Sequence, residues 1–257
     1  MKRSCPVPGS SACVTSREVE HFRQLAYNLV WKGVRMSIAQ FIAGYGTEMV
    51  RRTLQHVSMV AVALALAIGI AVPLGVAITG HDRIARWVIG AASVLFTVPS
   101  LALFALLVVA LAPIRQGTGN VPAVTALTLY SVLPIVRNTY VALRQVDAST
   151  VEAARGMGMT PSQTMLRVKL PLALPLIMAG VRNAGVMGVG VATIATLIGG
   201  GGLGHFIFEG IARTNRSMVV GGTIMITVLG LTVNGGLLLL EDALAPGGPT
   251  RRRHTRD

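Results

Sequence analysis

Residues 57–78 read VSMVAVALALAIGIAVPLGVAI, and this stretch continues to Gly80 without any Asp, Glu, Lys or Arg. A helix that crosses the hydrocarbon core of a bilayer needs about 20 such residues. Core helices of soluble proteins are rarely this long and apolar on every side. The stretch therefore predicts a membrane-spanning helix, in which Pro73 and Gly75 can form a kink because neighbouring helices satisfy the freed backbone groups.

Four more segments of similar length carry almost no charge: residues 87–114, 116–136, 172–198 and 217–240. Only one charged residue, Arg182, interrupts them. The segment from residue 87 is long and has Pro99 near its middle, so we expect it to tilt, kink or divide into two half-helices. Together the segments predict an all-α polytopic membrane protein with about five transmembrane helices.

The composition agrees with a membrane protein, since 52% of the residues are hydrophobic and 13% are charged. The net charge of +13 comes from basic residues scattered near segment ends. They form no single amphipathic face, so we expect membrane lipid and no nucleic acid as a partner. Cys5 and Cys13 match neither a redox motif nor a zinc ligand set, and Pro6 and Pro8 stand where a signal peptide would be apolar.

The chain divides into three parts. Residues 1–50 mix an opening rich in Pro, Gly and Ser with charges and aromatics, which favours a tail and an amphipathic helix in the membrane interface. Residues 51–242 contain the spans and form the transmembrane domain. Residues 243–257 form a basic tail that we expect in the cytoplasm. A polar loop, residues 137–171, joins the third and fourth spans.

This polar loop contains the signals of two short helices. Ser149 followed by Glu152 has the spacing of a capping box, and Gly156 or Gly158 supplies the stop, which predicts a first helix over residues 150–155. A helix of about six residues is not stable alone and must pack on something.

The second helix signal follows directly. Thr160, Pro161 and Gln163 have the order of a cap, a first-turn proline and a capping-box partner, and they predict a helix that runs toward Leu170. The first helix exposes Ala153 and Ala154, small side chains that suit close docking in a groove. An ordinary well-capped loop is the alternative explanation of both signals.

The loop also has a specific spacing: Glu-Ala-Ala, three residues, Gly, nine residues, an aliphatic residue, one residue, Leu-Pro. The residues that fulfil it are Glu152, Ala153, Ala154, Gly158, Val168, Leu170 and Pro171. It resembles the EAA loop of permease subunits of binding-protein-dependent ABC importers. The resemblance covers about residues 57–240 and implies a type I importer (MetI-like) permease fold with a cytoplasmic coupling helix.

In that family the coupling helix lies in a cleft of the ATPase subunit. The resemblance implies this contact for six residues: Ser149, Glu152, Ala153, Ala154, Arg155 and Gly158. Glu152 would serve as cap and polar contact, and Gly158 as the turn. The strings TVPSLALFALL, LPIVRNTYVAL and IGGGGLGHFIFEGI further resemble permeases for osmoprotectants such as glycine betaine, carnitine, choline and proline betaine.

The same resemblance implies three protein partners: a dimer of ATPase subunits, a second permease that is the same or homologous, and an extracytoplasmic solute-binding protein. No lysine follows a glycine in the manner of a phosphate-binding loop, so we expect ATP and Mg on the ATPase and no cofactor in this chain. Gly199, Gly201 and Gly204 satisfy GxGxxG but follow a membrane helix and not a strand, which favours a flexible loop at the outer end of the fourth span.

The chain shows no arrangement of catalytic or metal-ligating residues, and we expect His205 to be a loop residue and not a ligand. Arg182 and Asn183 interrupt a span, where a charge is costly and marks a functional candidate. A snorkelling arginine near the cytoplasmic end is the alternative. Other polar groups expected to line the path are Ser93, Thr97, Ser100, Thr193, Thr196 and Asn234.

Three aromatic residues, Phe96, Phe104 and Tyr130, lie well inside the spans, which favours packing over a cage for a quaternary ammonium group. We therefore expect the binding protein to select the solute. An ion-coupled secondary transporter is the rival function, and it is disfavoured because the five predicted spans contain no carboxylate.

The membrane topology follows from the position of the polar loop. A cytoplasmic loop at 137–171 places residues 81–86 and the C-terminal tail in the cytoplasm too. The N-terminus is then outside, which conflicts with Arg51 and Arg52 unless residues 18–50 add an element.

Overall fold

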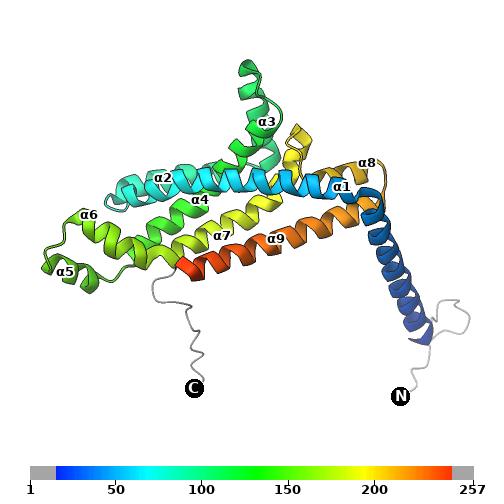
Figure 1. Ribbon diagram of the computed structural model, residues 1–257, viewed down its shortest axis with the longest axis horizontal. Helices are drawn as coiled ribbons and strands as arrows, with labels where there is room; N and C mark the ends of the chain where they lie inside the picture. Colours follow the sequence, from blue (N-terminus) through cyan, green and yellow to red (C-terminus); the bar gives the residue numbers. More distant parts are fainter. Residues whose placement is uncertain (1–15, 245–257) are drawn as a thin grey trace, which may run out of the picture.

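The computed structural model describes residues 16–244, with side chains at Glu20 and from Gly44 onward. Every regular element in this range is helical, as Figure 1 shows. Four long helices form the bundle: α1 (Ser16–Ile78), α4 (Asn120–Arg144), α7 (Leu170–Ile194) and α9 (Arg216–Leu244). Helices α1 and α7 each pack against the other three long helices, and α4 and α9 lie on either side of them.

The apolar helices confirm the predicted number of spans. Four are long and apolar enough to cross a membrane: Gly44–Ile78, Asn120–Arg144, Pro161–Ile198 and Arg216–Leu244. A bent pair, α2 (Asp82–Thr97) with α3 (Ser100–Leu111), makes five when it is counted as one span. The bend is 98° and lies at Pro99, which confirms the predicted division into two half-helices.

The helix of the first span begins earlier than the charge-free stretch suggested. Helix α1 runs from Ser16 to Ile78, and its described stretch Gly44–Ile78 is long and apolar enough to cross a membrane, so Glu48, Arg51 and Arg52 belong to the same helix. Most side chains of the predicted interfacial segment lie outside the described residues, as do residues 1–15 and 245–257. The three-part division of the chain stays a prediction.

The connection between the third and fourth spans is shorter than predicted. Helix α4 continues past Arg137 to Arg144, and the next long helix starts at Pro161. There α6 (Pro161–Thr164) continues through a short π-helix, η2 (Met165–Lys169), into α7. The prediction of a polar loop over 137–171 was therefore wrong, because a charged residue does not end a helix when no cap or stop signal accompanies it.

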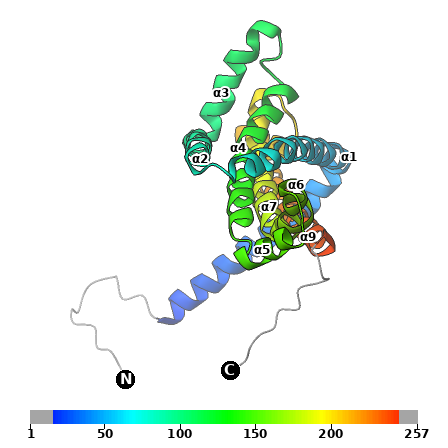
Figure 2. The ribbon, with the colours of Figure 1, turned by 90° about the vertical axis from the view of Figure 1, so that its left-hand side faces the viewer.

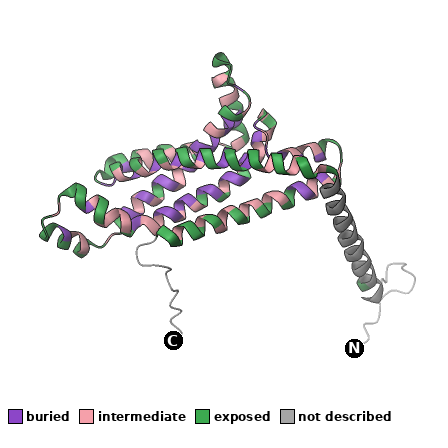
Figure 3. Cartoon of the chain, in the orientation of Figure 1, coloured by how far each residue is buried: buried purple, intermediate pink, exposed green. Residues whose placement is uncertain are grey.

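Small residues on α7 let the bundle close tightly. Gly180, Ala184, Gly188 and Ala192 recur at helical spacing on its buried face. A Cβ added to Gly180 would lie 2.9 Å from the backbone oxygen of Pro134 in α4, so glycine is needed for this approach. Figure 3 shows the buried residues on the facing sides of the helices and the exposed residues outside. The outer surface is apolar, as expected of helices in lipid.

Candidate functional site

A short helix, α5 (Ala148–Gly156), lies in the connection between α4 and α6 at one end of the bundle (Figures 1 and 2). Its N-cap is Asp147, which accepts hydrogen bonds from Ser149 N at 3.2 Å and from Ser149 Oγ at 2.8 Å. These two bonds, the side-chain one first, hold the pKa of Asp147 below its ordinary value. The predicted capping box of Ser149 and Glu152 was wrong, because the helix starts two residues earlier, with Asp147 as its cap.

The end of α5 has the geometry that the glycine spacing predicted. Gly158 has φ +82° and donates a backbone hydrogen bond to Arg155 O at 2.9 Å. Met159 N donates to Ala154 O at 3.2 Å, which closes the turn. A left-handed residue at this place strongly favours glycine.

The exposed residues of α5 are only partly those that were predicted. Glu152, Ala153 and Arg155 are exposed, together with Met157, but Ala154 is buried. Helix α5 packs on α6 and η2, so Ala154 stabilises the connection from inside and leaves the other three predicted residues for a partner. The capping box of Thr160 and Gln163 at the start of α6 is confirmed by both of its hydrogen bonds, at 2.9 and 3.3 Å.

The α2 end near Asp82 lies at the same end of the bundle as α5. Arg144 Nη1 is 3.1 Å from Asp82 Oδ1, and Tyr140 Oη donates to the same carboxylate at 3.1 Å. These contacts join the start of α2 to the end of α4. The loop around His81 and the connection that contains α5 therefore lie at the same end of the bundle.

The predicted path residues do not form one cluster. Four of the hydroxyl groups donate to backbone carbonyls, as many Ser and Thr side chains in membrane helices do: Ser93 to Ile89, Thr97 to Val94, Thr193 to Val189 and Thr196 to Gly201. Within residues 44–244, Ser100 and Asn234 make no side-chain hydrogen bond and are partly buried. Asn183 is the predicted residue that lies on a cavity.

Arg182 points away from this cavity, toward α9. Its Nη1 is 3.9 Å from Glu241 Oε2, and the two side chains are only 30% and 18% exposed. The ion pair favours a fixed interhelical contact over a snorkelling arginine. Sequence reasoning missed Glu241 because the charge-free run ended one residue earlier, at Leu240, whereas α9 continues to Leu244.

The cavity beside Asn183 has a volume of ≈ 500 Å³. Its wall is formed by seven residues of α2, α4 and α7: Phe96, Leu133, Pro134, Arg137, Asn138, Val141 and Asn183. Arg137 and Asn138 were missed because the predicted third span stopped before them. They lie one helical turn after Leu133 and Pro134, on the same face of α4. A predicted third span that continued past Val136 would have placed them on this face.

The aromatic side chains inside the spans are less scattered than predicted. Phe96 and Tyr130 make an edge contact, with ring centroids 5.9 Å apart and an interplanar angle of 76°. The Tyr130 hydroxyl donates to Val98 O at the α2–α3 break, and Phe104 is fully buried. Packing is thus the role of Tyr130 and Phe104, whereas Phe96 is 40% exposed and reaches the cavity.

The other end of the bundle holds the glycine-rich segment that precedes α8 (Gly204–Ala212). Leu203 N donates to His56 Nδ1 at 3.2 Å, and His56 Nε2 lies 3.1 Å from Val189 O. Because Nδ1 accepts, Nε2 carries the proton and donates to Val189. The buried imidazole thereby joins α1, α7 and the segment before α8, which is packed and not a loose loop. Sequence reasoning missed His56, since nothing local marks its partners.

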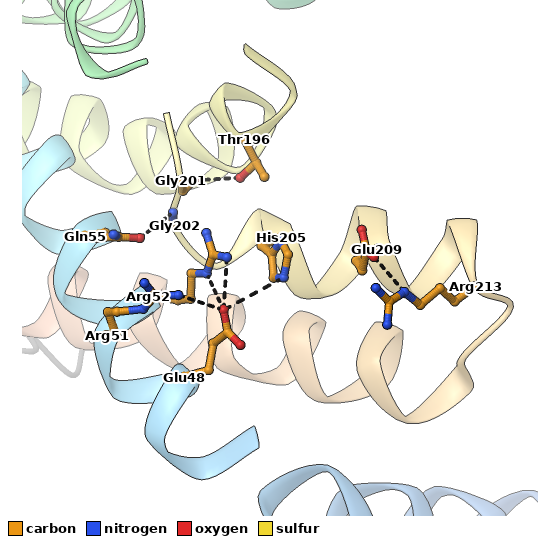
Figure 4. A network of polar contacts seen from close by, with 10 residues as sticks. All are labelled: Glu48, Arg51, Arg52, Gln55, Thr196, Gly201, Gly202, His205, Glu209 and Arg213. Atoms are coloured by element: carbon orange, nitrogen blue, oxygen red, sulfur yellow. Dashed lines mark hydrogen bonds and ion pairs between the residues drawn. The ribbon is translucent and has the colours of Figure 1, made fainter. Parts of the chain in front are cut away.

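A second set of contacts joins α1 to α8, as Figure 4 shows. The Glu48 carboxylate contacts Arg51 and Arg52 at 3.0 Å each and His205 Nε2 at 4.0 Å. His205 is a residue of α8 and not of a loop. Burial, and then the charge of Arg52, lower its pKa. The carboxylates Glu48 and Glu241 also correct the prediction that the spans contain none.

The family comparison matches residues 67–247 to a model described as a binding-protein-dependent transport system inner membrane component. The choline transport system permease protein OpuBB of Bacillus subtilis is 40% identical over 83% of this chain and 96% of its own length. The osmoprotectant import permease protein OsmW of Salmonella typhimurium is 46% identical over 80% of this chain and 94% of its own. The carnitine transport permease protein OpuCB of Listeria monocytogenes is 41% identical, over 82% and 94%.

The solved structures agree on the fold. A chain of the inward-facing MetNI methionine ABC transporter has a TM-score of 0.70 at 22% identity and covers 77% of this chain and 96% of that one. A chain of an amino acid ABC transporter with histidines has a TM-score of 0.65 at 19% identity and covers 78% of this chain and 95% of that one. The helical bundle thus has the permease fold that the EAA spacing implied. With a family model that spans most of its length, this chain belongs to the family of inner membrane components of binding-protein-dependent transport systems.

Proposed function

We propose that this chain is the permease subunit of an ATP-driven importer that carries a small osmoprotectant or amino-acid-like solute of the betaine, choline and carnitine class across the cytoplasmic membrane. The observation that carries the proposal is the similarity to permeases named for choline, osmoprotectants and carnitine, at 40–46% identity over 94–96% of their lengths. Because the similarity covers almost the whole length of these permeases, it includes all of their membrane spans.

The exposed face of α5 contacts the ATPase in this proposal. Ser149, Glu152, Ala153 and Arg155 lie on a short helix that projects from the bundle end, and Gly158 fixes its exit. Ala153 has a small side chain that permits close approach of a groove wall. Ala154 contributes by packing, since it is buried.

The assembly contains further chains. A dimer of ATPase subunits binds ATP and Mg, a second permease completes the path, and an extracytoplasmic binding protein selects the solute. This chain transports and does not hydrolyse ATP. In this proposal residues 51–242 are the main part of the transmembrane domain, and its first and last helices extend beyond these bounds, to at least Gly44 and to Leu244. The remaining residues of 1–50 form an N-terminal tail with an interfacial segment, and those of 243–257 a basic cytoplasmic tail.

Ion-coupled transport is the rival, and the carboxylates that it would need are already paired. Glu48 contacts Arg51 and Arg52, and Glu241 contacts Arg182. Each of these carboxylates therefore already faces an arginine counter-charge within the chain. This supports ATP as the energy source.

The experiment is reconstitution of this chain with its ATPase and binding protein in proteoliposomes. We expect uptake of labelled glycine betaine, carnitine or choline with ATP on the ATPase side, and none with a non-hydrolysable ATP analogue. Uptake that runs on an ion gradient with no ATP present would overturn the proposal.

A further inference from the structure

The cavity between α2, α4 and α7 presents polar groups that the protein itself does not use. Helix α4 contributes one continuous face, with Pro134, Arg137, Asn138 and Val141 at the spacing of successive turns. Helix α7 adds Asn183. The volume of ≈ 500 Å³ is in the range of small-molecule sites.

Arg137 is the main charged group of this cavity. Its side chain is exposed and has no ion pair or hydrogen bond within residues 44–244, in contrast to Arg182, which faces Glu241. An unpaired guanidinium in contact with lipid tails is costly, so this face of α4 borders water or another molecule. A planar guanidinium matches a carboxylate with two parallel hydrogen bonds.

Asn138 is held in place by the neighbouring helix. Its Cβ and Nδ2 lie over Gly180 of α7, where an added Cβ would approach them to 2.7 and 2.6 Å. Asn183 lies on the same cavity and is exposed. Amide groups donate as well as accept, so both can add hydrogen bonds to a carboxylate beside Arg137.

Phe96 supplies the apolar side of the cavity. Its ring is supported by the edge contact with Tyr130, whose hydroxyl is bound to Val98 O. An aromatic ring near a quaternary ammonium group attracts it through its negative face, and more strongly when water is excluded. The cavity therefore combines a cationic end for an anion with an aromatic wall for a cation.

We infer that this cavity is a transient binding subsite for the solute carboxylate. Arg137, Asn138 and Asn183 hold the carboxylate, and Phe96 receives the quaternary ammonium group. The inference rests on the proposed function and narrows it to zwitterionic solutes that carry both groups, such as glycine betaine and carnitine. Choline, which lacks a carboxylate, makes only the aromatic contact.

The test uses the complete importer in proteoliposomes and measures glycine betaine taken up per ATP hydrolysed. Arg137→Gln is expected to lower this ratio roughly tenfold while ATP hydrolysis stimulated by the binding protein stays within about twofold. Arg137→Lys is expected to restore only part of the ratio. Lysine keeps the positive charge but cannot make the two parallel hydrogen bonds of a guanidinium to a carboxylate. Arg86→Gln is the matched control, since Arg86 is an exposed arginine of α2 outside the cavity.

An unchanged ratio in Arg137→Gln overturns the inference and leaves Arg137 as an interfacial arginine near lipid phosphates. If Arg137→Gln abolishes the ATP hydrolysis stimulated by the binding protein, the same measurement is made on Asn183→Leu and Phe96→Leu. A wild-type ratio of glycine betaine to ATP in both of these variants also overturns the inference. A wild-type importer that takes up none of glycine betaine, carnitine and choline refutes the proposed function instead, whereas one that takes up choline alone overturns this inference and leaves the proposed function intact. The two failures are therefore distinguishable.

Discussion

The backbone N–H of Leu203 donates to Nδ1 of His56, a residue 147 positions earlier in the chain. The other ring nitrogen donates to Val189 O, so one buried side chain satisfies backbone groups of two further segments. The fit is close, because a Cβ added to Gly202 would lie 2.9 Å from the same Nδ1. The glycine-rich segment is thus held against α1 by one imidazole.

His56→Ala is expected to destabilise the protein, since it leaves the N–H of Leu203 without its partner, whereas Val189 O still accepts from Thr193 Oγ1. A buried donor that is left unsatisfied costs about 1–3 kcal/mol. The measurement is the thermal unfolding midpoint of the purified protein in detergent. Gln55→Ala is the control, because Gln55 is exposed and its part-buried contact with Gly202 N is 3.5 Å long. Equal midpoints for the two variants would contradict the assignment.

Gly158→Val is expected to impair coupling and not membrane insertion. A non-glycine residue at φ +82° costs about 1 kcal/mol or more, although an added Cβ would meet nothing within 4 Å. Gly156→Val is the matched control, since the space beside it is equally open and its φ is not left-handed. ATP-driven uptake should fall for Gly158→Val, and further with Glu152→Lys, at wild-type membrane levels. Unchanged uptake in that double variant would refute the role.

Arg182 and Glu241 are expected to show coupled effects. Replacing either by glutamine leaves the other partly buried and unpaired, so the double variant should lose less stability than the sum of the single variants. We expect a coupling of about 0.5–3 kcal/mol from the unfolding midpoints of the four proteins. The exposed pair Arg144 and Asp82 should give about 1 kcal/mol or less. Additive effects at Arg182 and Glu241 would show that the pair does not interact.

Gly180→Ala is expected to push α4 and α7 apart. The new Cβ would lie 2.6 Å from Asn138 Nδ2 and 2.9 Å from Pro134 O, and the backbone oxygen cannot move independently. Overpacking of this kind costs typically about 1–3 kcal/mol. Gly190→Ala on the same helix has open space and should be neutral or slightly stabilising. A Gly180→Ala protein as stable as Gly190→Ala would contradict this packing.

The sequence predicted the interiors of the helices better than their ends. Lipid excludes charge, so a charge-free run identifies a span, and Pro99 alone located the bend between α2 and α3. The same reasoning stopped α4 at Val136 and α9 at Leu240, because it treated the first charge as the membrane boundary. Arg137 and Glu241 instead lie in helices that continue.

Local motifs were predicted better than contacts between residues far apart in the chain. Thr160, Gln163 and Gly158 act on neighbours within a few residues, and their predicted geometry is confirmed. The cap at Asp147 was missed because two competing caps stand two residues apart. The partners of His56 depend on how α1 meets α7 and the segment before α8, which no local pattern encodes.

The short π-helix at Met165–Lys169 joins α6 to α7 without a break, so Pro161–Ile198 is one helix of 38 residues. At 1.5 Å per residue its helical path is about 57 Å long, with the α5 connection at one end and the glycine-rich segment at the other. The exposed face of α5 and the segment held by His56 are therefore the two ends of one uninterrupted helical path.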